Sequence, residues 1–111
     1  MVKQGSIIKI DFSPTIGSEQ AGYRPAVVVS NDFIISKTNI ISICPITNTK
    51  QRKSALNVIL DENTQIQGTI LCAHIRSVDI QKRGYKVIEQ VSEKKLDEVL
   101  EILIAMLDKN F

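Results

Sequence analysis

Two polar side chains stand where apolar runs meet loops, and both residue types can bind a phosphate group. Arg24 comes just before the apolar run at residues 26–29, and Thr47 ends a second run at residues 40–46. An arginine guanidinium holds two phosphate oxygens at once and stays protonated near neutral pH, while a threonine hydroxyl can donate to a non-bridging oxygen. If the two runs are neighbouring strands, we expect Arg24 and Thr47 to share one pocket.

Other kinds of catalytic site have little support in the sequence. His74 is the only histidine, and no pair of carboxylates lies near it at metal-ligand spacing. No serine occupies a nucleophile elbow, and no glycine-rich phosphate loop is present. The remaining donors and cations suit cleavage of RNA, whose own 2′-hydroxyl supplies the nucleophile, so the protein has to align it and stabilise charge at phosphorus. We therefore expect neither a metal ion nor a cofactor.

The elements that must position these residues are mostly strands. Apolar and polar residues alternate over residues 6–12, as in a half-buried strand. Residues 13–23 contain Pro14 and two glycines and are predicted to form a long loop, which is often a binding element. Similar signals predict further strands at residues 25–29, 39–46, 56–60, 69–78 and 86–90.

A helix is predicted after the strands. Ser92 is a suitable N-cap, and Val91 and Leu96 are spaced as a hydrophobic staple on either side of it. Apolar residues then recur every three or four positions as far as Leu107, in a stripe wide enough to contact both the sheet and a second subunit. Packing on its own core alone is the simpler explanation. The pattern predicts a mainly β domain, a small curved antiparallel sheet or barrel with a C-terminal helix packed against it.

Composition limits the size and the setting of the protein. With 111 residues, of which 43% are hydrophobic, residues 1–111 are expected to form a single domain. A net charge of +2 is too small to indicate nucleic-acid binding by itself. Cys44 and Cys72 lie in apolar runs without metal-binding spacing, which favours reduced, buried thiols over a disulfide. Without a signal-peptide core or an apolar run of about 20 residues, we expect a soluble cytoplasmic protein and no membrane partner.

Several motifs follow one another along the chain in a fixed order. They are Asp11-Phe12, Gly17-Ser18-Glu19-Gln20-Ala21-Gly22-Tyr23-Arg24-Pro25, Val29-Ser30-Asn31-Asp32, Pro45-Ile46-Thr47, and Ile75-Arg76-Ser77-Val78-Asp79 with Lys82-Arg83. In order and spacing they resemble the MazF/PemK family of toxin endoribonucleases of type II toxin–antitoxin systems, over nearly the whole chain. The resemblance implies an SH3-like barrel, a homodimer, and a cognate antitoxin that blocks the site. It also implies metal-independent, sequence-specific cleavage of single-stranded RNA (mRNA) to 2′,3′-cyclic phosphate and 5′-hydroxyl ends.

The resemblance also assigns roles to individual residues. By motif position, the family's catalytic arginine falls on Arg24 and its catalytic threonine or serine on Thr47. Family members often carry an acidic residue and a glutamine where this chain has Ala73 and His74. Ala73 cannot act as an acid, so the proton-transfer scheme and the cleavage sequence stay open. For His74 three hypotheses stand: a general base, a residue that stacks on an RNA base, or a structural strand histidine.

Other candidate RNA-binding residues are chosen by their position near these two. The basic run at residues 50–53 is expected to follow the RNA backbone, although such runs are more often solvated loops. Tyr23 either stacks on a base or anchors its loop, and Arg76 is assigned to a structural ion pair or to the dimer interface before catalysis. The RNA-binding candidates are Glu19, Gln20, Tyr23, Asn48, Lys50, Arg52, Lys53 and His74.

Simpler explanations exist for the two central residues and for the whole chain. Arg24 can be a surface residue paired with Glu19 or Asp79, and Thr47 can satisfy a turn at a strand end. A small barrel can also bind RNA or a peptide without cutting it, and a related toxin family with a similar barrel inhibits DNA gyrase. Conservative replacement of Arg24 or Thr47 separates these alternatives, because only in a nuclease does it abolish cleavage while sparing most binding.

Overall fold

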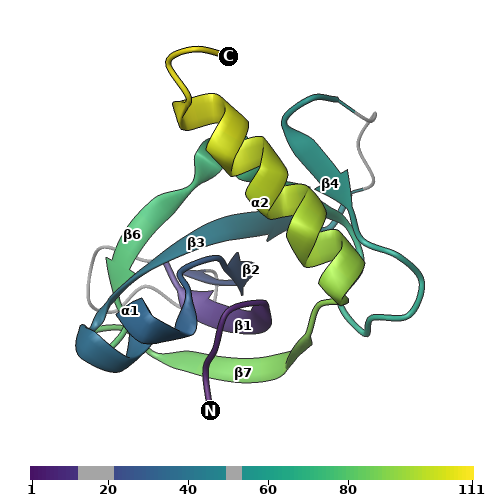
Figure 1. Ribbon diagram of the computed structural model, residues 1–111. Helices are drawn as coiled ribbons and strands as arrows, with labels where there is room; N and C mark the ends of the chain where they lie inside the picture. The colour runs from purple at the N-terminus through teal and green to yellow at the C-terminus, as the bar shows by residue number, and fades with distance from the viewer. Residues whose placement is uncertain (13–21, 50–53) are drawn as a thin grey trace.

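A curled antiparallel sheet with a helix across it is the architecture of the computed structural model, which describes residues 1–12, 22–49 and 54–111 (Figure 1). Within these residues the strands are β1 Ser6–Asp11, β2 Tyr23–Val28, β3 Ile40–Thr47, β4 Asn57–Ile59, β5 Thr69–Leu71, β6 Arg76–Asp79 and β7 Tyr85–Gln90. The helices are α1 Asp32–Lys37, the short 3₁₀ helix η2 Cys72–His74, and α2 Glu93–Leu107. The predicted mainly β fold with a terminal helix is confirmed. Strand order across the sheet is β4-β5-β3-β2-β1-β7, and β6 also pairs with β3.

β3 is the strand to which most of the sheet is attached. Its first half pairs with β6 and its last two residues pair with β5, while β2 lies along its other edge. Alternate residues of β3 enter two separate apolar clusters: Ile41 and Ile43 lie in one, Cys44 and Ile46 in the other. Burial of both faces explains why residues 40–46 read as an almost continuous apolar run. It also holds the strand, and hence Thr47 at its end, firmly in place.

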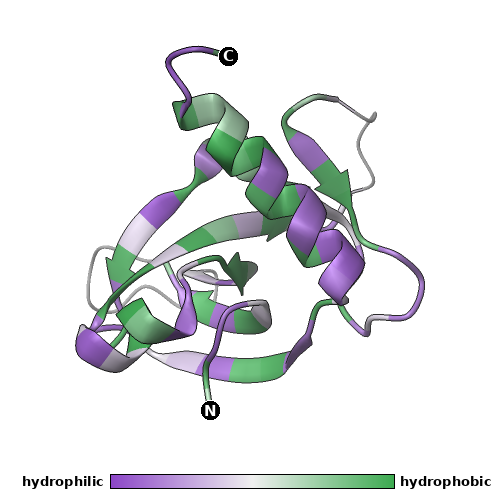
Figure 2. Cartoon of the chain, in the orientation of Figure 1, coloured by the Kyte–Doolittle hydropathy of each residue, from purple (hydrophilic) through white to green (hydrophobic). Residues whose placement is uncertain are grey.

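α2 covers the cluster that contains Cys44 (Figure 1). The Ser92 hydroxyl accepts a hydrogen bond from the Lys95 amide at 3.2 Å, which confirms the predicted N-cap. Val99 and Leu103 are buried in the cluster. The first turns of α2 are hydrophilic and the last turns are hydrophobic (Figure 2), and Leu107 in the last turn is 85% exposed. None of the described helices is long and apolar enough to span a membrane.

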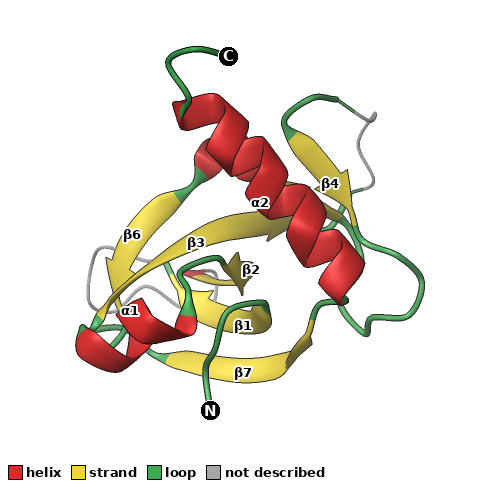
Figure 3. Cartoon of the chain, in the orientation of Figure 1, coloured by secondary structure: helices red, strands yellow, loops and turns green. Residues whose placement is uncertain are grey.

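The single strand predicted at residues 69–78 is wrong, because η2 interrupts it between β5 and β6 (Figure 3). The physical reason is a change of register along β3. β5 places Ile70 opposite Ile46, and continuing that register would bring residue 73 opposite Ile43. Arg76 lies there instead, so η2 takes up the intervening residues. Apolar periodicity carries no information about such a shift.

A second difference from the sequence prediction is α1, which lies between the strands predicted at residues 25–29 and 39–46, where no element was expected. The Asn31 side chain accepts a hydrogen bond from the Ile34 amide at 2.9 Å and so caps this helix. No residue of α1 is buried, so the helix lacks the apolar stripe that would have marked it in the sequence.

Candidate active site

Arg24 and Thr47 lie on neighbouring strands, on the same face of the sheet. The register of β2 with β3 pairs Ala26 with Pro45. Two residues further along each strand, this register brings Arg24 opposite Thr47, and side chains two residues apart on a strand share a face. Directly opposite residues on antiparallel strands have Cβ atoms about 5 Å apart. Both residues line one pocket, as the sequence predicted.

The pocket has a volume of about 500 Å³ and combines a polar set of side chains with apolar walls. Three of the predicted RNA-binding residues, Tyr23, Asn48 and His74, line it together with Arg24 and Thr47. The other predicted binding residues, Glu19, Gln20, Lys50, Arg52 and Lys53, lie outside the described residues. Apolar walls come from Pro25, Pro45, Ile46 and Leu71.

Arg24 is exposed, and it forms no ion pair with any carboxylate among residues 1–12, 22–49 and 54–111. The suggested pairing with Asp79 is therefore wrong, and the alternative partner, Glu19, falls outside the described residues. No described carboxylate pairs with the guanidinium donors of Arg24, so these donors can bind a ligand in the pocket. Their fork geometry matches the oxygens of a phosphate.

Thr47 is held at the end of β3 by neighbours that the sequence analysis did not single out. Its hydroxyl lies 3.0 Å from the Thr49 hydroxyl, and the Thr69 hydroxyl donates to the Thr49 carbonyl at 3.0 Å. Gly68 has φ +132°, and a Cβ atom at that position would overlap the Thr47 carbonyl oxygen. A glycine is required here both for its backbone conformation and for this close approach. Only the fold reveals this role, because Gly68 lies 21 residues from Thr47 in the sequence.

Tyr23 and His74 are the two ring-bearing candidates for base recognition, and both line the pocket. Tyr23 is 45% exposed, and its hydroxyl fills the space where a side chain on Gly84 would lie. Tyr23 therefore packs against the turn at Gly84 and also lines the pocket. His74 is exposed and ends η2, so the hypothesis of a structural strand histidine is wrong. It lines the pocket beside Thr47, and the general base and the RNA contact stay predictions.

Two other arginines of the sequence motifs have structural partners. The Arg76 guanidinium lies 5.1 Å from the centre of the Phe12 ring, in a cation–π contact. Arg83 donates a hydrogen bond from Nη1 to the Asp11 carbonyl oxygen at 2.8 Å. Both interactions secure the end of β1. Arg76 forms no ion pair with the carboxylates that the structure describes, so its partner is an aromatic ring where an ion pair was predicted, and the dimer interface stays a prediction.

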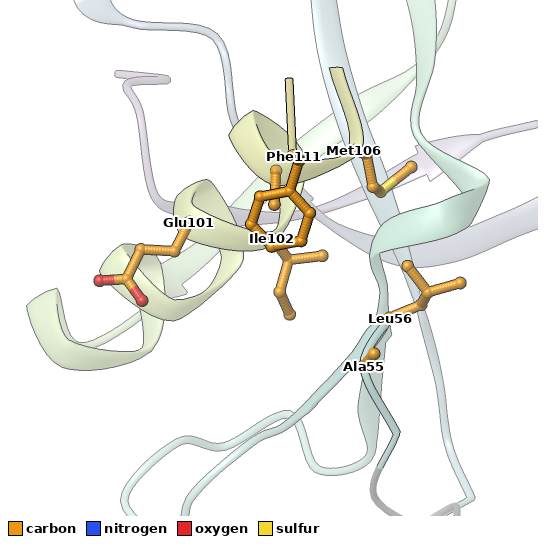
Figure 4. A pocket seen from close by; sticks show the side chains of 7 residues that line it. Ala55, Leu56, Glu101, Ile102, Met106 and Phe111 are labelled. Carbon is orange, nitrogen blue, oxygen red and sulfur yellow. The ribbon is translucent and has the colours of Figure 1, made fainter. Parts of the chain in front are cut away.

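A second pocket of about 500 Å³ lies beside the C-terminal half of α2 (Figure 4). It is lined by Ala55, Leu56, Glu101, Ile102, Ala105, Met106 and Phe111. Among the described residues of this lining, the Glu101 side chain alone is charged, and it points away from the apolar side chains (Figure 4). None of these described side chains can donate a hydrogen bond to a phosphate. Among the described residues, no cluster of three or more His, Cys, Asp or Glu side chains is arranged to hold a metal ion.

Comparison with known proteins identifies a family and several relatives for this chain. The family model described as PemK-like, MazF-like toxin of type II toxin-antitoxin system matches residues 3–107. The chain is 32% identical over 114 residues to endoribonuclease EndoA of Bacillus subtilis (strain 168), covering 97% of this chain and 98% of that protein. It is 38% identical over 80 residues to endoribonuclease toxin MazF of Escherichia coli (strain K12), covering 72% of this chain and 70% of that protein.

Solved structures with the same fold include two toxin–antitoxin complexes. A crystal structure of MazE-MazF (Form-III) from Deinococcus radiodurans superposes with a TM-score of 0.83 at 26% identity, covering 96% of this chain and 95% of that chain. An endoribonuclease in complex with its cognate antitoxin from Mycobacterial species has a TM-score of 0.77 at 17% identity, with the same coverage of each chain. The second likeness concerns the fold alone.

Proposed function

This chain belongs to the PemK-like, MazF-like toxin family of type II toxin–antitoxin systems and is an endoribonuclease, and we propose that the pocket of Arg24 and Thr47 is where it cleaves RNA. One observation carries this proposal. The strand register places a phosphate-binding cation opposite a hydroxyl donor, and both line one open pocket. The proposed substrate is single-stranded RNA, including mRNA, cut at a short sequence.

The proposed reaction is an attack of the RNA's own 2′-hydroxyl on the adjacent phosphorus. The bond from phosphorus to the 5′-oxygen breaks, which leaves a 2′,3′-cyclic phosphate and a 5′-hydroxyl without the help of a metal ion. Negative charge develops on the non-bridging oxygens in the transition state, and fixed donors aimed at that charge supply a large part of the rate enhancement. Arg24 binds two of these oxygens through its fork, and the Thr47 hydroxyl donates to one and holds the phosphate in line.

The remaining pocket residues are assigned to the RNA on either side of the cleaved bond. His74 and Tyr23 offer ring surfaces on which unstacked bases can lie, and Asn48 offers both a donor and an acceptor to base edges. Lys50, Arg52 and Lys53 follow Thr47 in the sequence and are assigned to the RNA backbone. Glu19 and Gln20, just before Arg24, are assigned to base recognition.

Two protein partners belong to the proposal. A cognate antitoxin is expected to cover the pocket, because relatives of the same fold are described as complexes of toxin and antitoxin. A second copy of the chain is expected to cover part of the end of α2, where Ile104 and Leu107 are 67% and 85% exposed. A cytoplasmic location follows from the proposed mRNA substrate.

The reaction is tested by the chemistry of its products. The purified protein is incubated with a long single-stranded RNA in EDTA, and the new ends are identified. A 5′-hydroxyl accepts phosphate from polynucleotide kinase without prior dephosphorylation, and a 2′-deoxy nucleotide at the cut site blocks the reaction. RNA that stays intact with a correctly folded protein would favour the non-catalytic binding module or gyrase inhibition.

A further inference from the structure

The two cysteines of the chain face each other across neighbouring elements, Cys44 on β3 and Cys72 directly after β5. Both are free and fully buried. The register of β3 with β5 places Ile46 opposite Ile70, and two residues further along each strand it brings Cys44 opposite Cys72. Cys72 is the first residue of η2, so the pair lies at the point where the register along β3 changes.

The backbone hydrogen bonds show which kind of cross-strand pair this is. The Cys72 amide donates to the Leu56 carbonyl at 3.0 Å, away from β3. The Ser42 carbonyl accepts from the Val29 amide at 2.9 Å, on the β2 side, and Cys44 two residues later has the same orientation. The cysteines are therefore a non-hydrogen-bonded pair, for which Cα atoms lie about 4.5 Å apart. Disulfides join cysteines whose Cα atoms are roughly 4.4–6.8 Å apart, so this pair can close.

The two thiols already interact. The Cys44 thiol donates a hydrogen bond to the Cys72 sulfur, which raises the pKa of Cys44 and lowers the pKa of Cys72. Burial adds to the rise at Cys44 and opposes the fall at Cys72.

The cysteine pair lies directly behind the proposed active site. Thr47 follows Cys44 by three residues on β3, and His74 follows Cys72 by two residues on η2. Both Thr47 and His74 line the pocket. A covalent bond between the cysteines would therefore tie together the two elements that carry Thr47 and His74.

We propose that hydrogen peroxide oxidises Cys44 and Cys72 to a reversible intramolecular disulfide, and that this bond suppresses RNA cleavage in the adjoining pocket. The second part rests on the proposed function. The Cys72 thiolate attacks one peroxide oxygen and breaks the O–O bond, which gives a sulfenic acid and, after protonation, one water. The Cys44 sulfur then attacks the Cys72 sulfur, the S–S bond forms, and the sulfenic oxygen leaves as a second water. Two thiols lose two electrons to one peroxide, and a dithiol reductant reverses the change.

The elements around the cysteines explain how peroxide reaches Cys72 and how the disulfide lowers the rate of cleavage. β4 and β5 flank Cys72 and are only three residues long each, so local opening admits a molecule as small as peroxide. Closing the bond fixes the sulfurs at about 2.0 Å, and because most disulfides hold their Cα atoms about 5.5–6 Å apart, we expect η2 to shift relative to β3. His74 then shifts relative to Thr47, and a misplacement of about 1 Å can lower the rate of a positioned reaction by roughly 100-fold.

The disulfide is tested by mass spectrometry, which needs no RNA. The reduced protein is treated with hydrogen peroxide, unfolded, and reacted with a maleimide. We expect a monomer that has lost two hydrogens, takes up no maleimide, and yields a linked peptide containing Cys44 and Cys72. Two labelled thiols, or a bond between two chains, would overturn the proposal.

The effect on activity is tested on the same samples. Cleavage by the wild type should fall at least tenfold on oxidation and return with dithiothreitol, whereas Cys44→Ala and Cys72→Ala should each keep their activity under peroxide. Because two separate variants are used and the loss in the wild type is reversed by dithiothreitol, the result does not depend on the folding of any one variant. Unchanged cleavage by a fully linked wild type would overturn the switch. Reduced protein that cuts no RNA would refute the ribonuclease proposal and the switch with it, while the mass measurement would still decide the disulfide.

Discussion

The pocket of Arg24 and Thr47 and the pocket beside α2 have about the same volume, close to 500 Å³, yet they differ in what their linings can do. The first carries a guanidinium, a hydroxyl, an amide and an imidazole above apolar walls. The second is lined by aliphatic and aromatic side chains, with one carboxylate turned aside (Figure 4). Volume therefore does not separate the proposed active site from the second pocket, whereas the placement of described donor side chains does.

The difference arises from where each pocket lies on the strands. Arg24 and Thr47 are near the ends of β2 and β3. They lie on the same faces of their strands as the buried residues Ala26 and Ile43, but beyond the edge of the core. The buried strands hold these polar side chains at a fixed separation while their ends remain open to a ligand. The pocket beside α2 lies instead where a helix packs incompletely on a loop, so its residues contribute to packing. The following variants test this contrast, from the largest expected effect to the smallest.

Replacement of Arg24 by lysine should have the largest effect on cleavage. Lysine keeps the charge but loses the planar fork that holds two phosphate oxygens. Removing a transition-state arginine typically costs about 1,000-fold or more in rate, so we expect single-turnover cleavage of a short fluorescent RNA to fall by that order. Binding of the same RNA carrying a 2′-deoxy nucleotide at the cut site should change much less. Equal losses in both measurements would assign Arg24 to binding alone.

Replacement of Thr47 by valine removes the hydroxyl and keeps the shape of the side chain. Loss of one donor to a developing oxyanion lowers kcat by roughly 100-fold, and we expect a loss of that size. Thr47→Ser is the matched control, since it keeps the hydroxyl and should retain most of the activity. If valine and serine variants cleave equally well, the hydroxyl does not contact the phosphate.

Replacement of Gly68 by alanine tests how Thr47 is positioned. The new Cβ atom would overlap the Thr47 carbonyl and would also force alanine to φ +132°. We expect roughly tenfold slower cleavage, together with a loss of about 1–3 kcal/mol in the free energy of unfolding from backbone strain. Gly5→Ala is the control, because Gly5 also has a positive φ, +89°, but contacts Gln90 and Leu96 instead. It should lower stability in urea unfolding and leave the cleavage rate of the folded protein unchanged.

Replacement of His74 by alanine should alter which sequences are cut more than whether RNA is cut. Stacking of one base on an aromatic ring contributes about 1–3 kcal/mol, so cleavage of the preferred sequence should slow by roughly tenfold. The preference among competing sequences should weaken at the same time, as read by sequencing the products of a mixed RNA pool. If the variant keeps the sequence preference but its cleavage rate no longer rises with pH as the wild-type rate does, His74 is the general base.

Replacement of Ile102 by alanine, in the pocket beside α2, should have the smallest effect on activity. Ile102 is partly buried against the core, so the change should lower the free energy of unfolding by about 1–2 kcal/mol, less than for a fully buried isoleucine. Cleavage per folded molecule should stay at the wild-type rate. A large fall in cleavage without unfolding would show that the two pockets are coupled.

Patterns within a short stretch of sequence predicted most of the fold. The strand at residues 6–12 and the Ser92 cap depend on neighbours within a few positions, and both are confirmed, although β1 is buried on both faces at Ile7 and Ile8 and is not half-buried as predicted. The interruption between β5 and β6 depends on how two distant segments pair with β3, so periodicity alone gave one strand there. α1 buries no residue, and its single signal, the Asn31 cap, was interpreted as the end of a strand.

The site was predicted less completely than the fold, for a related reason. Arg24 and Thr47 were found from residue type and from their position at the ends of apolar runs. That they lie opposite each other follows from the β2–β3 register, which the sequence did not specify. Gly68 and the Cys44–Cys72 pair matter because of contacts between segments far apart in the chain. Such contacts leave no local pattern to detect.

The central claim, that cleavage takes place in the polar pocket, is tested most directly by mapping cut sites with three proteins side by side. Wild type, Arg24→Lys and Ile102→Ala are each incubated in EDTA with the same long single-stranded RNA, and every new 5′ end is sequenced. We predict cuts at one recurring short sequence for the wild type and Ile102→Ala, and almost none for Arg24→Lys. The same cuts at the same rate from Arg24→Lys, or their loss in a folded Ile102→Ala, would contradict this account.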